Sequence, residues 1–231
     1  LVSINATLAG SGTLAIGNAI GSNIANVGLV LGVTVLLVPL MVDRSCMRKE
    51  VPTLLVVTLG TGFLLLDGTL SRLDGSLMLG ALILLLVQMI RSQTSDPVLL
   101  EEAETEPLPH LKPLRAWLTF AFGLLLLIAS SRILVYGAVM AAKELGVSEL
   151  VIGLTIVAIG TSLPELAATL ASAKRGHTEI ALGNIIGSNL FNLLAVMSIP
   201  GILQPQALEP LVVTRDYSVM TVLTLLLAGA I

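Results

Sequence analysis

Residues 17–26 read Gly-Asn-Ala-Ile-Gly-Ser-Asn-Ile-Ala-Asn, and residues 183–192 read Gly-Asn-Ile-Ile-Gly-Ser-Asn-Leu-Phe-Asn. The two stretches are identical at seven of ten positions and lie 166 residues apart. The same offset pairs Gly10 with Gly176, Lys49 with Arg215 and Glu50 with Asp216. A match that extends beyond the motif indicates that a unit of several helices is duplicated.

The composition places these copies in a lipid bilayer. Hydrophobic residues make up 55% of the 231 residues and charged residues only 12%, whereas a soluble domain carries roughly 25% charged residues. The mean hydropathy is +0.98. Apolar runs long enough to cross a bilayer recur along the chain. The predicted spans are Leu14–Pro39, Val51–Leu66, Leu73–Ile90, Ala116–Ala142, Leu150–Ala173, Ile180–Leu203 and Tyr217–Ile231, and Leu1–Ala9 is interpreted as the end of a further span.

One hydrophilic stretch, residues 91–115, separates the two halves. It contains four glutamates and four prolines and is interpreted as an acidic linker. Loops on its side of the membrane carry eight basic residues and the opposite loops carry three, so the positive-inside rule places the linker in the cytoplasm. The helices that precede the two motif copies then run in opposite directions. The sequence therefore predicts an all-α integral membrane protein with inverted repeats, residues 1–90 and 116–231, a construction common in secondary transporters.

Several functional classes are disfavoured by the composition. The net charge is −3 and the twelve basic residues are scattered, so we expect no nucleic-acid partner. Cys46 is the single cysteine, and His110 and His177 have no partners at metal-ligand spacing, so neither a disulfide nor a zinc or haem site is indicated. We expect no resident cofactor. The expected partners are inorganic cations and the lipid bilayer, and the expected location is the cell (inner) membrane, crossed several times.

An acidic residue, Glu165, lies well inside a predicted span, at the end of the sequence Gly-Thr-Ser-Leu-Pro-Glu. An ionisable group there is costly unless it faces a cavity or a partner. Pro164 lacks an N–H and so frees the carbonyl of Gly160, while Thr161 and Ser162 share a helix face with Glu165. These groups are the hard oxygen ligands that Ca²⁺ prefers. The alternative is structural: a packing kink, and a carboxylate with a structural partner.

The repeated motif supplies further oxygen ligands. Ser22 and Asn26 are four residues apart, as are Ser188 and Asn192, so each pair projects from one face of its helix. Four-residue spacing also relates the motif's two glycines in each copy, which lets another helix approach closely. The alternative is that the asparagines only join helices to each other. Duplication beside Glu165 favours ion coordination.

Together, the sequence around Glu165 and the two motif copies resemble the sodium/calcium exchanger family of cation antiporters. The resemblance spans essentially the whole chain. It implies two inverted repeats of about five transmembrane helices each, truncated at both ends here, and exchange of Ca²⁺ for Na⁺ or H⁺ by alternating access. By motif position, it implies that ion ligands come from Thr161, Ser162, Glu165, Ser188, Asn192, Ser22 and Asn26, with a backbone carbonyl from Ala158.

Two departures from the family pattern matter. The offset places the repeat partner of Glu165 before Leu1, so half of the expected carboxylate pair is missing, and we predict that this chain alone does not transport. Asn192 stands where calcium-transporting members often have Asp, which lowers the charge of the site. The alternatives are a cation channel or an exchanger for a different cation. An intramembrane enzyme is disfavoured because no second deep acid and no nucleophile with a base is evident.

Overall fold

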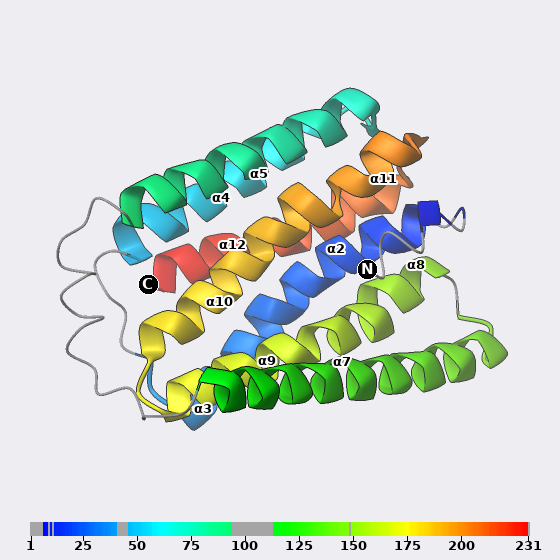
Figure 1. Ribbon diagram of the computed structural model, residues 1–231. Helices are drawn as coiled ribbons and strands as arrows, with labels where there is room; N and C mark the ends of the chain where they lie inside the picture. Colours follow the sequence, from blue (N-terminus) through cyan, green and yellow to red (C-terminus); the bar gives the residue numbers. More distant parts are fainter. Residues whose placement is uncertain are drawn as a thin grey trace.

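The computed structural model describes residues 7–8, 10, 12–40, 46–93, 113–147 and 149–230, which form a helical bundle (Figure 1). Stretches with π-helical hydrogen bonding are labelled η. The elements of the first half are α2 (Gly12–Ala25), η1 (Asn26–Leu31), α3 (Gly32–Leu37), η2 (Cys46–Glu50), α4 (Val51–Leu64), β1 (Thr69–Leu70) and α5 (Arg72–Gln93). Those of the second half are α7 (Pro113–Glu144), α8 (Glu149–Ile152), η3 (Gly153–Val157), α9 (Ala158–Lys174), α10 (Thr178–Phe191), η4 (Asn192–Val196), α11 (Ser198–Leu203), β2 (Gln206–Ala207), η5 (Val212–Tyr217) and α12 (Ser218–Ala230).

Five of the predicted spans are helices long and apolar enough to cross a membrane. They are Gly12–Leu37, Arg72–Arg91, Leu154–Lys174, Thr178–Leu203 and Val212–Ala230. The other two predicted spans fall on α4, of 14 residues, and α7, of 32 residues. Most of the predicted linker, residues 94–112, lies outside the described residues, as does most of Leu1–Ala9. The predicted all-α membrane fold is confirmed.

Helix boundaries repeat at the same 166-residue offset as the sequence. α2 and α10 end where Asn26 and Asn192 begin π-helical turns, and α3 and α11 follow. The turns η2 and η5, which begin at Cys46 and Val212, precede α4 and α12 in the same way. In Figure 1, α2 runs opposite to α10, and α4 runs opposite to α12, which it contacts. The inverted repeat predicted from the sequence is therefore present in three dimensions.

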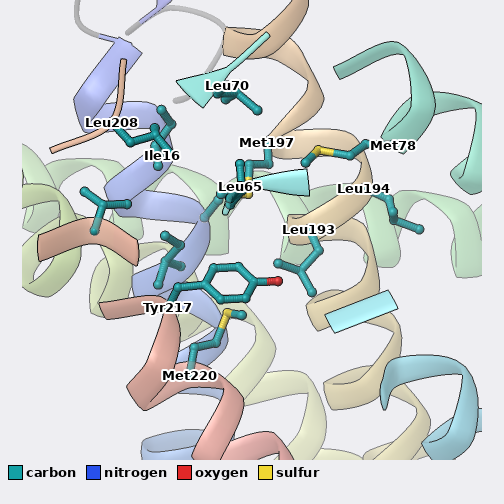
Figure 2. Packing of buried hydrophobic residues seen from close by; sticks show 13 residues of the cluster. Ile16, Leu65, Leu70, Met78, Leu193, Leu194, Met197, Leu208, Tyr217 and Met220 are labelled. Carbon is teal, nitrogen blue, oxygen red and sulfur yellow. The ribbon is translucent and has the colours of Figure 1, made fainter. Parts of the chain in front are cut away.

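A buried apolar cluster joins the two repeats (Figure 2). Its members are Ile16, Ala19, Ile20, Leu65, Leu70, Met78, Leu193, Leu194, Met197, Leu208, Val212, Tyr217 and Met220. The Tyr217 hydroxyl donates to the Thr58 carbonyl at 2.6 Å and so links η5 to α4. Lipid is as apolar as this cluster, so close packing and interhelical hydrogen bonds hold such a bundle together. The crossing of α5 and α11 illustrates this, because a Cβ added to Gly201 would lie 3.0 Å from the Gly75 Cα.

Two short strands, which the sequence did not predict, connect the loops after α4 and α11. β1 and β2 pair antiparallel, with Thr69 opposite Ala207 and Leu70 opposite Gln206. Gly68 precedes β1 with a φ of +74°, a conformation that favours glycine, and its carbonyl accepts from the Leu208 N–H at 2.8 Å. This pairing ties a loop of the first repeat to a loop of the second.

Candidate functional site

The helix that carries Glu165 lies against both copies of the repeated motif. α9 contacts α2, which carries the first copy, and α10, which carries the second. Where these three helices meet, polar side chains gather; we call this site the polar crossing. It comprises Asn18, Ser22, Asn23, Asn26, Thr161, Glu165, Asn184, Ser188, Asn189 and Asn192, which are joined by the hydrogen bonds described below.

Glu165 faces the second copy of the motif. The Ser188 hydroxyl donates to Glu165 Oε1 at 3.4 Å. The other carboxylate oxygen, Oε2, is buried and accepts no hydrogen bond from the described residues. The helix continues through Pro164 to Lys174, so the carboxylate is held on a continuous element. The structure thus leaves one oxygen of an intramembrane carboxylate available to a positive charge.

Thr161 faces the first copy, one turn earlier on α9. Its hydroxyl lies 3.0 Å from the Ser22 hydroxyl, 3.1 Å from Asn18 Oδ1 and 3.1 Å from the Ala158 carbonyl oxygen. Asn18 Oδ1 and the carbonyl only accept, so Thr161 donates toward them and Ser22 donates to Thr161. The predicted residues Ser22, Thr161 and Ala158 therefore lie together. Ser162, also predicted, is 2% exposed on the same helix.

Four asparagines form side-chain hydrogen bonds from one repeat to the other. Asn26 Nδ2 donates to Asn189 Oδ1 at 2.9 Å, and Asn192 Nδ2 donates to Asn23 Oδ1 at 3.0 Å. The 166-residue offset converts one of these bonds into the other, because it pairs Asn23 with Asn189 and Asn26 with Asn192. Asn23 and Asn189 were not among the predicted site residues. Their conservation between the two copies of the motif was the signal that could have identified them.

Asn184 also escaped prediction as a site residue. Its Nδ2 donates to Thr169 Oγ1 at 2.8 Å and to the Glu165 carbonyl oxygen at 3.4 Å. Thr169 is completely buried. Asn184 therefore fastens α10 to the turn of α9 that carries Glu165, and so supports the carboxylate without contacting it.

The motif glycines behave differently in the two copies. A Cβ on Gly21 would lie 2.5 Å from the Leu154 carbonyl oxygen and 2.8 Å from the Ala158 Cβ. The predicted close approach of another helix is confirmed there, because only a residue without a side chain fits. At Gly187 nothing lies within 4 Å among the described residues. The prediction is not met at Gly187 in this part of the chain, where the residue is exposed.

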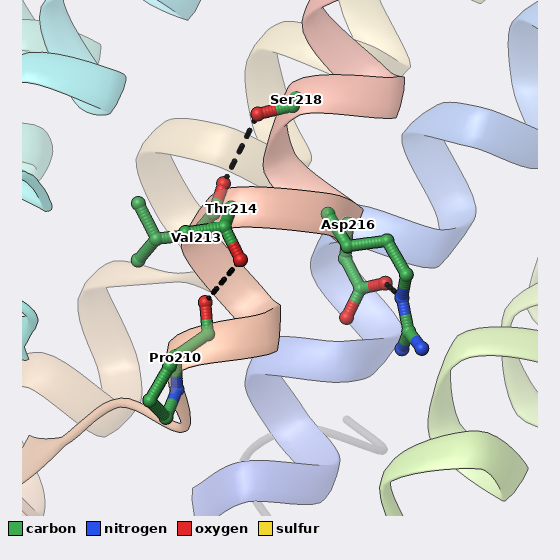
Figure 3. A network of polar contacts seen from close by, with 6 residues as sticks. Pro210, Val213, Thr214, Asp216 and Ser218 are labelled. Carbon is green, nitrogen blue, oxygen red and sulfur yellow. Dashed lines mark hydrogen bonds and ion pairs between the residues drawn. The ribbon is translucent and has the colours of Figure 1, made fainter.

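A second buried carboxylate, Asp216 on η5, is paired with an arginine through Oδ1, while its Oδ2 accepts no hydrogen bond from the described residues. Asp216, 6% exposed, accepts from Arg215 Nε at 2.6 Å (Figure 3). On the same segment Thr214 Oγ1 donates to the Pro210 carbonyl at 2.8 Å.

A groove of about 410 Å³ runs along η5 and α12, and none of its lining residues belongs to the predicted site. In the described ranges no three His, Cys, Asp or Glu side chains form a metal cluster.

The inverted repeats, with an intramembrane carboxylate where they meet, define a membrane protein of the secondary-transporter class. Residues 1–91 and 115–231 match the family described as "Sodium/calcium exchanger protein", and the chain belongs to this family. It is a multi-pass membrane protein. The resemblance seen in the sequence is thereby confirmed.

Relatives cover nearly all of the chain. CaxA of Alkalimonas amylolytica is 45% identical over 231 residues, which are 98% of this chain and 72% of that protein. Inner membrane protein YrbG of Escherichia coli (strain K12) is 38% identical over 234 residues, covering 99% of this chain and 72% of that protein. A solved structure of the sodium-calcium exchanger NCX_Mj matches with a TM-score of 0.77 at 30% identity, and covers 99% of this chain and 72% of that one. The similarity therefore includes both repeats.

Proposed function

We propose that the protein is a secondary active antiporter that exchanges Ca²⁺ for Na⁺ or H⁺ at the polar crossing. The observation that carries this proposal is the buried, unpartnered Oε2 of Glu165 within the described structure. An ionised carboxylate inside a membrane is costly unless a positive charge or donors compensate it. A transported cation supplies that charge and leaves again, which a fixed basic side chain cannot do.

The neighbouring groups suit a hard cation. Glu165, Thr161 and Ser22 present carboxylate and hydroxyl oxygens, and Asn26 Oδ1 is buried with no donor among the described residues. Oxygen ligands of this kind bind Ca²⁺ and Na⁺ rather than soft metals. Asn192 is neutral, so it adds an oxygen without adding negative charge. The site's low charge makes the choice of cation a question to test directly.

The architecture supports alternating access. Inverted repeats can exchange their two conformations, which opens a fixed midplane site first to one side and then to the other. α9 contacts both copies of the motif, so a change in how the two repeats pack also changes how Glu165 and Thr161 are held. A channel requires a continuous pore instead, and the polar crossing is closely packed around buried asparagines.

The test is ⁴⁵Ca²⁺ uptake into proteoliposomes that contain the full-length protein, with an imposed Na⁺ gradient in one arm and an imposed H⁺ gradient in the other. We expect gradient-driven uptake in wild type and background uptake in Glu165→Gln. Glu179→Gln is the matched control, because Glu179 is exposed in the first turn of α10.

Each outcome has a definite meaning. Uptake without any counter-ion gradient at equal rate would indicate a channel. Absence of uptake in both arms would remove Ca²⁺ as the substrate and direct the same assay to other cations. Normal uptake by Glu165→Gln would reject the polar crossing as the transport site.

A further inference from the structure

We infer that Asn23 and Asn189 are positioning residues, which orient the amides of Asn192 and Asn26 so that the amide oxygens are turned toward the transported cation. This inference rests on the proposed function. It concerns two residues that bind the neighbouring amides through their own oxygens.

The two ends of an asparagine amide have opposite chemistry. Oδ1 binds a cation, whereas the Nδ2 hydrogens repel one, and rotation of the amide by about 180° exchanges them. A neutral asparagine is thus a cation ligand only while something fixes its orientation. A carboxylate has no such requirement, because it presents oxygen in both orientations. A site that uses Asn26 and Asn192 as ligands therefore needs groups that hold these amides.

A backbone carbonyl fixes the first amide. Asn23 Nδ2 donates to the Asn189 carbonyl oxygen at 3.3 Å and lies 3.5 Å from Met220 Sδ. A carbonyl oxygen only accepts, so this bond determines which end of the Asn23 amide is nitrogen. Asn23 Oδ1 is then directed at Asn192, whose Nδ2 donates to it at 3.0 Å. Because Nδ2 of Asn192 is engaged there, its Oδ1 is turned away from Asn23.

The orientation of the second amide, that of Asn26, is coupled to the orientation of Asn189. Asn26 Nδ2 donates to Asn189 Oδ1 at 2.9 Å, and Asn26 Oδ1 is left buried without a donor from the described residues. If Asn189 alone rotated, two NH₂ groups would face each other, so the two amides keep a common orientation. Asn26, Asn189 and Asn23 are 1%, 1% and 2% exposed, so little water competes for these bonds.

We call each pair of bonded asparagines a relay: in one, Asn23 orients Asn192, and in the other, Asn189 orients Asn26. The two relays differ in whether the Nδ2 of the orienting asparagine has an acceptor. Asn23 Nδ2 is bonded, but Asn189 Nδ2 is buried and has no acceptor within the described ranges. The repeat equivalent of the Asn23 bond would join Asn189 Nδ2 to the Asn23 carbonyl. Leu54 also stands where the other repeat has Met220. Asn192 is consequently the more firmly oriented amide, and Asn26 depends on Asn189 alone.

The first experiment measures the relay in the absence of transported cations. A double-mutant cycle of thermal stability combines Asn23→Leu with Asn192→Leu in the full-length protein, purified in detergent with chelator. We expect the second substitution to lower the melting temperature clearly less once the first is present, because the two share one hydrogen bond. Additive shifts would overturn the relay.

The second experiment measures cation affinity by exchange. Asn189→Leu should raise the half-saturating Ca²⁺ concentration by about tenfold, the factor expected for loss of one hydrogen bond to a buried group. In an Asn26→Asp background, the same substitution should change it by less than about threefold, because a carboxylate needs no orientation. Equal changes in both backgrounds would indicate a merely structural role and overturn the inference.

A conservative variant covers the case in which Asn189→Leu does not fold. Asn189→Asp keeps an acceptor for Asn26 Nδ2 and should retain wild-type affinity or bind more tightly. A clear loss of affinity in Asn189→Asp would also overturn the inference. Failure of the proposed function is distinguishable, because it would appear in wild-type protein as absence of cation binding and exchange, while the chelator experiment still reports on the relay.

Discussion

The two copies of the repeated motif have nearly the same sequence but different surroundings. In the first copy Ser22 is 4% exposed and bonds to the Thr161 hydroxyl. In the second copy Ser188 is half-buried and donates to the Glu165 carboxylate. α9 packs on both copies. Its earlier turn, with Thr161, contacts the first copy, and its later turn, with Glu165, contacts the second. One motif thus has two roles, and the turn of α9 that faces each copy decides which.

The largest expected effect concerns the close contact of the first copy. Gly21→Ala would force a Cβ to within 2.5 Å of the Leu154 carbonyl oxygen, so we expect it to lower the free energy of unfolding by about 1–3 kcal/mol. Gly28→Ala is the matched control, because nothing described lies within 4 Å of it, and it should change stability by less than about 1 kcal/mol. Unfolding in mixed micelles with increasing SDS measures both. Equal losses would show that the close contact at Gly21 does not make this position less tolerant of a side chain than Gly28.

The second prediction separates the two turns of α9. Thr161→Val removes a hydroxyl that contacts Ser22 and Asn18, and should lower stability by about 1–2 kcal/mol and weaken cation affinity. Thr169→Val removes the hydroxyl that accepts from Asn184 Nδ2, and should lower the free energy of unfolding by about 1 kcal/mol. Unfolding and ⁴⁵Ca²⁺ exchange are measured on the same preparations. A larger loss of affinity in Thr169→Val than in Thr161→Val would contradict these assignments.

The third prediction concerns a contact that the repeat does not duplicate. Tyr217 bonds to the Thr58 carbonyl, whereas its equivalent in the first repeat is Val51. Tyr217→Phe should lower the free energy of unfolding by about 1 kcal/mol, the value for one interhelical hydrogen bond in a membrane protein. Tyr136→Phe is the control, since Tyr136 is 70% exposed on α7. No difference between the two variants would mean that this bond does not join the repeats.

The smallest effect tests the asymmetry of the asparagines. Met220→Leu makes the second repeat match Leu54 of the first, and removes the sulfur near Asn23 Nδ2. The swap nearly conserves volume, so we expect a loss of stability below about 1 kcal/mol. Since Asn23 keeps its bond to the Asn189 carbonyl, cation affinity should change less than in Asn189→Leu. A loss as large as that of Asn189→Leu would show that the sulfur, not the carbonyl, orients Asn23.

Much of the site was predictable because its signals are local. Hydropathy located the spans, and Glu165 stood out because an acid within an apolar run is costly. The spacing of Ser22 from Asn26 placed both on one helix face. Asn23 and Asn189 were missed because local spacing identifies a shared face but not the atom across the crossing that each amide meets. Gly187 was predicted to have a close neighbour because the sequence around it matches that around Gly21. No described residue lies within 4 Å of the position that a Cβ of Gly187 would take.

The sequence by itself determined the spans, the inverted duplication and the family, because hydropathy and a repeated motif are properties of neighbouring residues. Only the tertiary structure decided that Thr161 meets the first copy and Glu165 the second, that four asparagines form two related hydrogen bonds, and that β1 pairs with β2. These contacts join residues far apart in the chain. Their partners depend on how whole helices cross, and local periodicity does not specify that geometry.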